Sequence, residues 1–283
     1  MTEKNEITLC SISNIASGTC LEDCKFCTQS VKYGAKIDRY SRKEISKILE
    51  EAKNLYSLGA TGFCLVTAGK GLDKKTLKYV VEVADKIKNK IPDLNLIACN
   101  GTVTKNDLKE LQKAGVGSYN HNLETSKEFY PKICTTHSWD ERWETLQNVK
   151  EVGLDLCSGG IVGMGESEED RESMLNSLKE LQPESIPINF YHHNEALPLQ
   201  KNPLSIETGF KILDKFRENF PKQRIMVAGG RESFFGERQE EIFSHGINSI
   251  VIGNYLTTKG RESHKDLEML KKLNLKVAGR CEN

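Results

Sequence analysis

The feature that most restricts the fold of this chain is a regular alternation of short apolar runs and longer amphipathic stretches. Eight apolar or β-branched runs occur, and each is followed by a stretch with helical spacing. Continuous apolar strands that alternate with amphipathic helices are typical of a parallel sheet covered by helices. The runs cover residues 7–13, 62–69, 94–102, 116–125, 154–163, 185–192, 224–230 and 249–254.

Eight such units in 283 residues predict an α/β fold, a (β/α)8 TIM-type barrel that forms a single domain over residues 1–283. An open doubly wound sheet is the alternative, which the alternation alone does not exclude. In a barrel, functional residues gather at the C-terminal ends of the strands. Ser41 with Glu44 and Ser138 with Glu141 have the spacing of helix capping boxes, and Gly59 has the position of a helix stop.

Composition narrows the class of protein. Lysine plus arginine and aspartate plus glutamate number 40 each, so the formal net charge is zero. Without a basic stripe, the charge pattern does not favour nucleic-acid binding. The first ten residues are polar, and no apolar stretch approaches the ~18 residues of a membrane span. We therefore expect a cytoplasmic protein whose nine cysteines are reduced and serve metal binding or catalysis.

Three cysteines fall within eight residues directly after the first run, at Cys20, Cys24 and Cys27. Clustered thiolates bind zinc, copper(I) or iron–sulfur clusters. Structural zinc sites and ferredoxin-type clusters use four protein ligands, and no fourth close thiol follows. A [4Fe–4S] cluster held by three thiolates would keep one iron open. A redox pair of Cys24 and Cys27, or three unrelated thiols, are the alternatives.

A second group of cysteines lies within the second, third and fifth apolar runs, at Cys64, Cys99 and Cys157. Alternate residues of a barrel strand point inward, so three strand thiols can converge inside. Each one alone could be an ordinary small core residue. Together, in a chain that already carries a cysteine loop, they favour a second metal site.

The cysteine loop resembles that of the radical S-adenosylmethionine (SAM) superfamily. The resemblance rests on the CxxxCxxC spacing after a first barrel strand and on Phe26 before the last cysteine. A weaker match is the segment GGIVGMGE, residues 159–166, where glycines let the backbone approach a ligand closely. The resemblance implies that Cys20, Cys24 and Cys27 hold a [4Fe–4S] cluster. It also implies that the open iron binds SAM, which is cleaved to a 5′-deoxyadenosyl radical.

The two cysteine groups together resemble the biotin synthase family over nearly the whole chain. The matching segments are SGTCLEDCKFCTQS, GFCLVTAG, SYNHNLETS, CSGGIVGMGE, PINF, AGGRE and YLTTKG. This resemblance implies that Cys64, Cys99 and Cys157 hold an auxiliary iron–sulfur cluster, [2Fe–2S] or a larger type, whose sulfide is inserted into dethiobiotin. It also implies an electron donor such as flavodoxin or ferredoxin, a homodimer, and no acid–base catalytic residue.

The same resemblance assigns further positions one at a time. SAM would be bound by Phe26, by Asn122 and Glu124 near the ribose, by Arg142 near the methionine carboxylate, and by Glu166 at the amino group. Arg142 could instead be an ordinary exposed helix residue. We expect His121, between the two ribose positions, to be a structural hydrogen-bonding residue.

Dethiobiotin would be met by Asn122, by the amide of Asn189 at its ureido ring, and by Thr257 and Thr258 at its carboxylate. A side-chain amide offers both a donor and an acceptor, as the N–H and C=O of a ureido group require. The two threonines could alternatively belong to an ordinary polar loop. Cys134 and Cys281 match no ligand position of the family, and we expect both to be free thiols.

The chain departs from the family at one ligand position. Many members carry an arginine ligand of the inner cluster just before AGRE, and Met226 aligns with it here, while Arg224 lies one inward position deeper. A thioether is a weak neutral acceptor and replaces an arginine poorly. We hypothesise that Cys10, on the first strand, supplies the fourth ligand; the alternative is a buried Cys10 without a ligand role.

Overall fold

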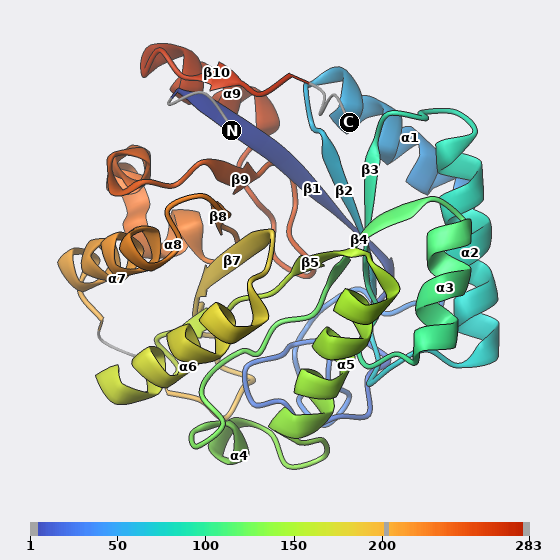
Figure 1. Ribbon diagram of the computed structural model, residues 1–283, viewed down its shortest axis with the longest axis horizontal. Coiled ribbons are helices and arrows are strands. Elements are labelled where there is room, and N and C mark those ends of the chain that lie inside the picture. Colours follow the sequence, from blue (N-terminus) through green and yellow to red (C-terminus); the bar gives the residue numbers. More distant parts are fainter. Residues whose placement is uncertain (1–4, 201–203, 280–283) are drawn as a thin grey trace.

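The strands form a closed parallel barrel in a computed structural model that describes residues 5–200 and 204–279 (Figure 1). Seven barrel positions are single strands, every neighbouring pair is parallel, and β1 closes the barrel against β9. The predicted (β/α)8 barrel is therefore confirmed, and the open sheet is excluded. The seven strands are β1 (Glu6–Ala16), β2 (Gly62–Thr67), β3 (Asn95–Cys99), β4 (Val116–Asn120), β7 (Ser185–Phe190), β8 (Arg224–Val227) and β9 (Ser249–Val251).

The remaining barrel position, between β4 and β7, is split into β5 (Asp155–Cys157) and β6 (Gly160–Val162). The sequence predicted one run there. Gly159 explains the break, because its backbone passes so close to the carbonyl of Pro187 on β7 that any side chain would collide. A further short strand, β10 (Lys276–Val277), was not predicted and pairs with the start of β1 outside the barrel.

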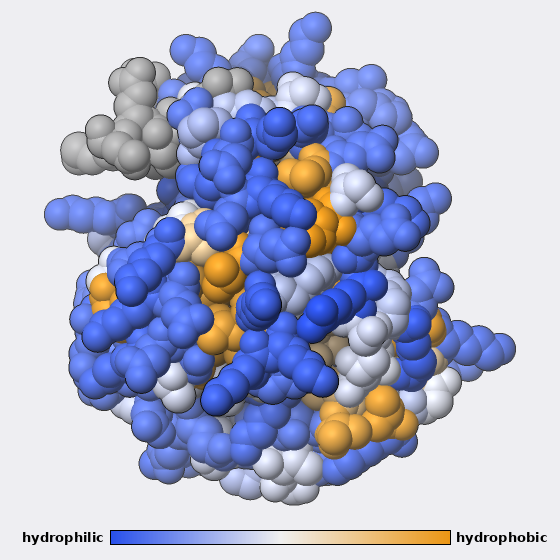
Figure 2. Space-filling model, turned by 90° about the vertical axis from the view of Figure 1, so that its right-hand side faces the viewer, coloured by the Kyte–Doolittle hydropathy of each residue, from blue (hydrophilic) through white to orange (hydrophobic). Residues whose placement is uncertain are grey.

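Helices surround the barrel on its outer side (Figure 1). The face that carries α1 to α3 is mostly hydrophilic, with apolar side chains in small separate groups (Figure 2). This is the solvated surface that interspersed charges predict. The helices are α1 (Ile45–Ser57), α2 (Lys74–Lys88), α3 (Lys105–Lys113), α4 (Tyr130–Ile133), α5 (Trp139–Val152), α6 (Glu168–Leu181), α7 (Ile206–Asn219), α8 (Arg231–Phe235) and α9 (Ser263–Lys272), with a 3-10 helix η1 (Gly236–His245).

The predicted capping boxes have different outcomes. Ser138 and Glu141 cap α5 reciprocally, as predicted. The box at Ser41 and Glu44 is wrong, because α1 begins at Ile45 and Glu44 caps it without a side-chain bond. The preceding backbone is instead held extended against the end of β1, where the Lys43 N–H donates to the carbonyl of Ile15 at 2.8 Å. The predicted stop at Gly59 is confirmed, since Gly59 has a φ of 95° directly after the helix.

Two apolar regions make up the core. The larger one lies between the barrel and its helices, as the buried faces of α2 and α7 show. The smaller one is inside the barrel and contains Cys10, Cys64 and Met226 among its buried residues. Among the described residues, no helix is long and apolar enough to cross a membrane.

One buried ion pair ties the end of the barrel wall to the last helix. The side chain of Arg231, at the start of α8, is completely buried, and its guanidinium donates to both oxygens of Asp266 on α9 at 2.9 and 3.0 Å. Glu232 accepts a further bond at 3.0 Å. A guanidinium in this position is stable only while its carboxylates remain.

We predict that Asp266→Ala lowers the free energy of unfolding by about 3 kcal/mol, because it leaves most of a buried charge uncompensated. Urea denaturation measures the change. Glu262→Ala is the matched control, since Glu262 pairs with Lys265 on the surface of the same region, and its removal leaves stability unchanged. A loss for Asp266→Ala no larger than that of the control would contradict the role of this pair.

Candidate functional site

The main cavity opens at the C-terminal ends of the strands, as the barrel predicts, and has a volume of about 500 Å³. Its walls come from the loops after β1, β2, β4, β7, β8 and β9. The loop after β1 lies beneath the barrel near α4 and the start of α5 (Figure 1). Seven thiols line this one cavity: Cys10, Cys20, Cys24, Cys27, Cys64, Cys99 and Cys157.

The cysteine loop is fixed to the end of β1 by one buried amide, that of Gln29. Its Oε1 accepts from the Gly18 N–H at 2.6 Å and from the Ser17 hydroxyl at 3.2 Å, and its Nε2 donates to Asn14 at 3.2 Å. The loop is therefore a preformed structure that presents its thiols toward the cavity.

Burial keeps two thiols of the loop protonated. It raises the pKa of Cys20, and it raises the pKa of Cys27 to about 12. Because metals bind thiolates, occupation of this loop by a metal must release protons and must supply the charge that stabilises the thiolates.

The inner end of the cavity holds four thiols from four different strands. Cys10 and Cys157 are buried, and a hydrogen bond with Cys99 followed by burial raises the pKa of Cys64 well above its ordinary value. The charges of Cys157 and Cys10 act on Cys64 as well, so the four sulfurs are near neighbours. The strand cysteines that the sequence singled out are thus brought together, and Cys10 lies with them.

The position on β8 that aligns with the arginine ligand of the family also lines the inner end of the cavity. Met226 is 6% exposed and lines the cavity with the four thiols. Arg224 is half-buried, lies outside the cavity lining, and pairs in register with Ser185 of β7. The side chain of β8 that lines the cavity beside the inner thiols is therefore a thioether, although the charge of Arg224 still acts on Cys157.

The wall between the two thiol groups is a charged network after β4. Arg142 of α5 is 8% exposed, and it donates to the Tyr130 hydroxyl at 2.7 Å and to the carbonyl of Asn122 at 2.8 Å. Its guanidinium lies 3.6 Å from the carboxylate of Glu124. Burial opposes the charge of Arg142, but Glu124 and Tyr130 outweigh it and raise its pKa. The alternative of an exposed helix residue is excluded.

Three buried polar atoms beside this network have no hydrogen-bond partner: Oδ1 of Asn120, Nε2 of His121 and Oε2 of Glu124. All three residues line the cavity. Burial raises the pKa of Glu124 and lowers that of His121 well below its ordinary value, so the imidazole is neutral. Buried acceptors without partners are rare, and here they mark a place for a polar ligand with hydroxyl or amino groups. His121 lines the cavity with an unpaired ring nitrogen, and its structural role stays a prediction.

The residues predicted to meet a substrate line the same cavity. Asn189, Thr257 and Thr258 line the cavity, and the Thr257 hydroxyl is 2.7 Å from that of Thr28 in the cysteine loop. The Asn189 amide is engaged at both ends, because it donates to Gly160 O at 3.1 Å and accepts from Gly229 N–H at 2.8 Å. Both ends of the Asn189 amide can form one more hydrogen bond, since the NH₂ has a second hydrogen and the oxygen has a second lone pair.

Of two further residues predicted to contact SAM, one lines the cavity and the other does not. Phe26 lines the cavity beside the loop thiols. Glu166 does not line it, and its carboxylate accepts from the N–H groups of Gly163 and Met164 and from Arg171. Glu166 therefore shapes the glycine-rich turn, and its contact with the cofactor stays a prediction.

One more thiol lies at the site. Cys134 is a free thiol, as expected, but it also accepts a hydrogen bond from Cys24 at 3.6 Å and lies 3.3 Å from Nδ1 of His137, which the sequence did not predict. The contact with Cys24 lowers the pKa of Cys134 to about 4, and His137 lowers it as well. A cysteine followed three residues later by a histidine was the signal in the sequence. Cys281 lies outside the described residues.

Comparisons with known proteins agree with this geometry. The model of the radical SAM superfamily matches residues 14–178, and that of the biotin and thiamin synthesis associated domain matches residues 187–276. Among solved structures, the FeFe-hydrogenase maturase HydG from Carboxydothermus hydrogenoformans superposes with a TM-score of 0.83 at 17% identity, over 96% of this chain and 67% of that one. Methylornithine synthase (PylB) gives 0.83 at 20% identity, over 98% and 85%. At these identities the likeness concerns the fold.

With its barrel and its cysteine loop, the chain is a member of the radical SAM superfamily. It is 63% identical to a biotin synthase of Sulfurimonas denitrificans over 96% of this chain and 98% of the relative. It is 56% identical to that of Aliarcobacter butzleri over 98% of each. Within the superfamily, the chain belongs to the biotin synthase family.

We predict that Gln29→Ala loosens the cysteine loop. It leaves the Gly18 N–H without its partner and removes one bond each from Ser17 and Asn14, so the free energy of unfolding falls by about 1–3 kcal/mol. Hydrogen exchange at Gly18 measures the local effect, and urea denaturation measures the global one. Gln112→Ala is the control, because Gln112 makes one exposed contact on α3. Unchanged protection of Gly18 in Gln29→Ala would contradict the role of this amide.

Proposed function

We propose that this chain converts dethiobiotin to biotin by radical sulfur insertion, with SAM as the source of the radical. The observation that carries the proposal is the pair of separate thiol groups in one cavity, three on a loop at its mouth and four on strands at its inner end. A single-cluster enzyme needs the first group only. The second group supports an auxiliary cluster that faces the same substrate space.

The loop group fits a [4Fe–4S] cluster with one open iron. Cys20, Cys24 and Cys27 lie on one fixed loop, and they offer soft sulfur donors to the cavity. When bound, this cluster and SAM together supply the one-electron cleavage chemistry of the superfamily.

The charged network after β4 fits the polar parts of SAM. The unpaired Oε2 of Glu124 can accept from ribose hydroxyls, and the Asn122 side chain lies beside it. Arg142 holds Glu124 in place through their ion pair and provides the positive charge for a carboxylate. Phe26 offers an apolar surface next to the loop thiols.

The strand group fits an auxiliary iron–sulfur cluster held by Cys64, Cys99 and Cys157, with Cys10 as the fourth ligand. Thiolate is a strong ligand for iron, whereas the thioether of Met226 is a weak one. Cys10 is close enough to Cys64 and Cys157 to act on the pKa of each. Four thiolates support a different cluster type from the arginine-ligated form.

Dethiobiotin fits between the two groups, against Asn122, Asn189, Thr257 and Thr258. The amide of Asn189 faces the ureido ring in this proposal, and the two threonine hydroxyls face the carboxylate at the mouth. The resemblance to the family supports an electron donor such as flavodoxin or ferredoxin, a homodimer, and a cytoplasmic location.

The function is tested with anaerobically reconstituted protein, a reductant, SAM and dethiobiotin. We predict 5′-deoxyadenosine and biotin from the unchanged chain, neither product from Cys27→Ala, and 5′-deoxyadenosine without biotin from Cys64→Ala. A different radical enzyme would cleave SAM with no stimulation by dethiobiotin, and that result would contradict the substrate assignment.

The fourth inner ligand is tested by a matched pair of variants. We predict that Cys10→Ala loses iron and sulfide from the auxiliary cluster in Mössbauer spectra and chemical analysis, because three thiolates then remain. Met226→Leu removes the thioether at similar volume and keeps the full iron content. The reverse outcome, loss in Met226→Leu and full content in Cys10→Ala, would assign the position to Met226.

A further inference from the structure

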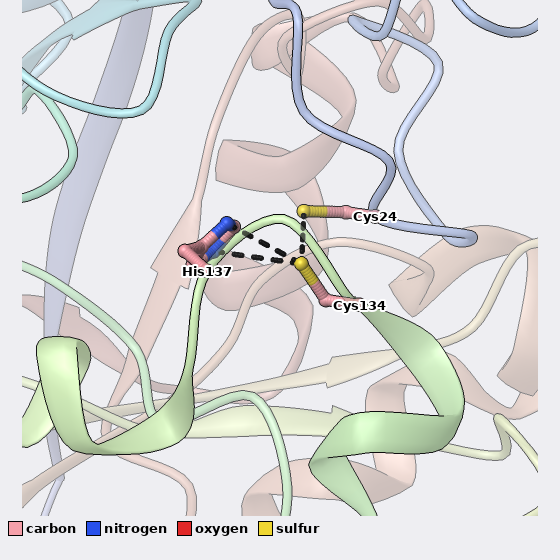
Figure 3. Close-up of side chains that lie close together, drawn as sticks. All are labelled: Cys24, Cys134 and His137. Carbon is pink, nitrogen blue, oxygen red and sulfur yellow. Dashed lines mark hydrogen bonds between the residues drawn. The ribbon is translucent and has the colours of Figure 1, made fainter.

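A second group of metal-binding side chains lies at the back of the cysteine loop. The side chain of Cys24 points toward Cys134 and His137, which come from the segment between α4 and α5 (Figure 3). The ligand atoms of the three residues lie within 4.8 Å of one another, and all three residues are buried. Two cysteines and one histidine form a donor set that suits thiophilic divalent ions.

The distances between these donors match those around one tetrahedral ion. Bonds of ~2.3 Å to sulfur and ~2.0 Å to nitrogen place two sulfurs about 3.8 Å apart and a sulfur and a nitrogen about 3.5 Å apart. Here the two sulfurs are 3.6 Å apart, and Sγ of Cys134 is 3.3 Å from Nδ1 and 3.8 Å from Nε2 of His137. The donors need only small shifts to share an ion.

The histidine is oriented as a ligand would be. Its Nδ1 lies 2.6 Å from the carboxylate of Glu22, and the Arg142 guanidinium approaches Nε2 at 3.4 Å. Because a guanidinium can only donate, Nε2 is the acceptor and Nδ1 carries the proton. A carboxylate that accepts from Nδ1 is the usual support of an imidazole that binds a metal through Nε2, and an ion there would replace the contact with Arg142.

The surroundings favour a cation. Asp23 accepts from the Thr135 and Thr136 N–H groups at 2.9 and 3.1 Å, and its Oδ1 is 3.4 Å from the sulfur of Cys134. This carboxylate fixes the turn that carries Cys134. Asp23 and Glu22, together with the two thiolates that form when an ion binds, outweigh the positive charge of Arg142 and of Lys70, which is paired with Glu141. Cys24 and His137 also line the main cavity, so a fourth ligand position on that side is open to solvent.

We propose that the cluster-free chain binds one thiophilic divalent transition-metal ion of the zinc or iron(II) class through Cys24, Cys134 and His137. Cys24 is shared with the loop group to which we assign the [4Fe–4S] cluster, so the ion and that cluster compete. This competition rests on the proposed function, whereas the ion site rests on its own three donors.

Cobalt(II) is the probe, added anaerobically to the full-length, reduced, metal-free chain. We expect Cys134→Ala to bind one cobalt ion fewer than the unchanged chain and to lose the corresponding thiolate-to-cobalt charge-transfer band. His137→Gln weakens the same ion at least tenfold and shifts its band. Circular dichroism melting of both variants confirms that they are folded.

Two controls locate the ion. Cys20→Ala keeps the Cys134-dependent ion, because Cys20 is not one of the three donors, and Cys64→Ala keeps it because any ion at the strand thiols is separate. The proposal is overturned if Cys134→Ala binds as many cobalt ions as the unchanged chain, or if Cys20→Ala loses the same ion as Cys134→Ala. Since neither SAM nor turnover enters the measurement, failure of this site and failure of the proposed function are distinguishable.

Discussion

The inward alternation of side chains on parallel strands is the constraint on which the rest of this structure depends. Every second residue of a barrel strand faces the interior, so cysteines far apart in the sequence meet without any local motif. Cys10 and Cys64 come from neighbouring strands, and Cys157 comes from across the barrel. The same architecture places the loop after β1 at the mouth of the cavity, so two thiol groups share one space.

Arg142 joins these parts electrostatically. It holds the backbone of Asn122 and faces Glu124 on the cavity wall, and it also reaches His137 behind the cysteine loop. A buried guanidinium must be compensated, and the buried carboxylate of Glu124 gains stability from the same pairing. The wall that we assign to SAM is therefore fixed before any ligand binds, which lowers the cost of ordering it on binding.

The fold was predictable because it rests on the periodicity of apolar residues and the lengths of the segments. Both are local properties that the alternation of apolar runs and amphipathic stretches shows directly. The strand thiols were predictable as a group because the side chains of a barrel strand point either to the interior or to the outside. Local spacing gave a wrong prediction where tertiary contacts determine the backbone. At Ser41 the expected helix cap is absent, because this segment pairs with the end of β1. Cys134 shows the same limit. A thiol that meets Cys24 across 110 residues leaves no periodic signal.

The central claim, that one cavity holds two separate iron–sulfur clusters, is tested most directly by iron-edge anomalous diffraction from anaerobically reconstituted crystals. The account predicts two anomalous peaks in the cavity, one beside Cys20, Cys24 and Cys27 and one among the strand thiols, with the sulfur of Cys10 bonded to the second. A single peak at the loop, with no iron among the four strand thiols, would contradict it.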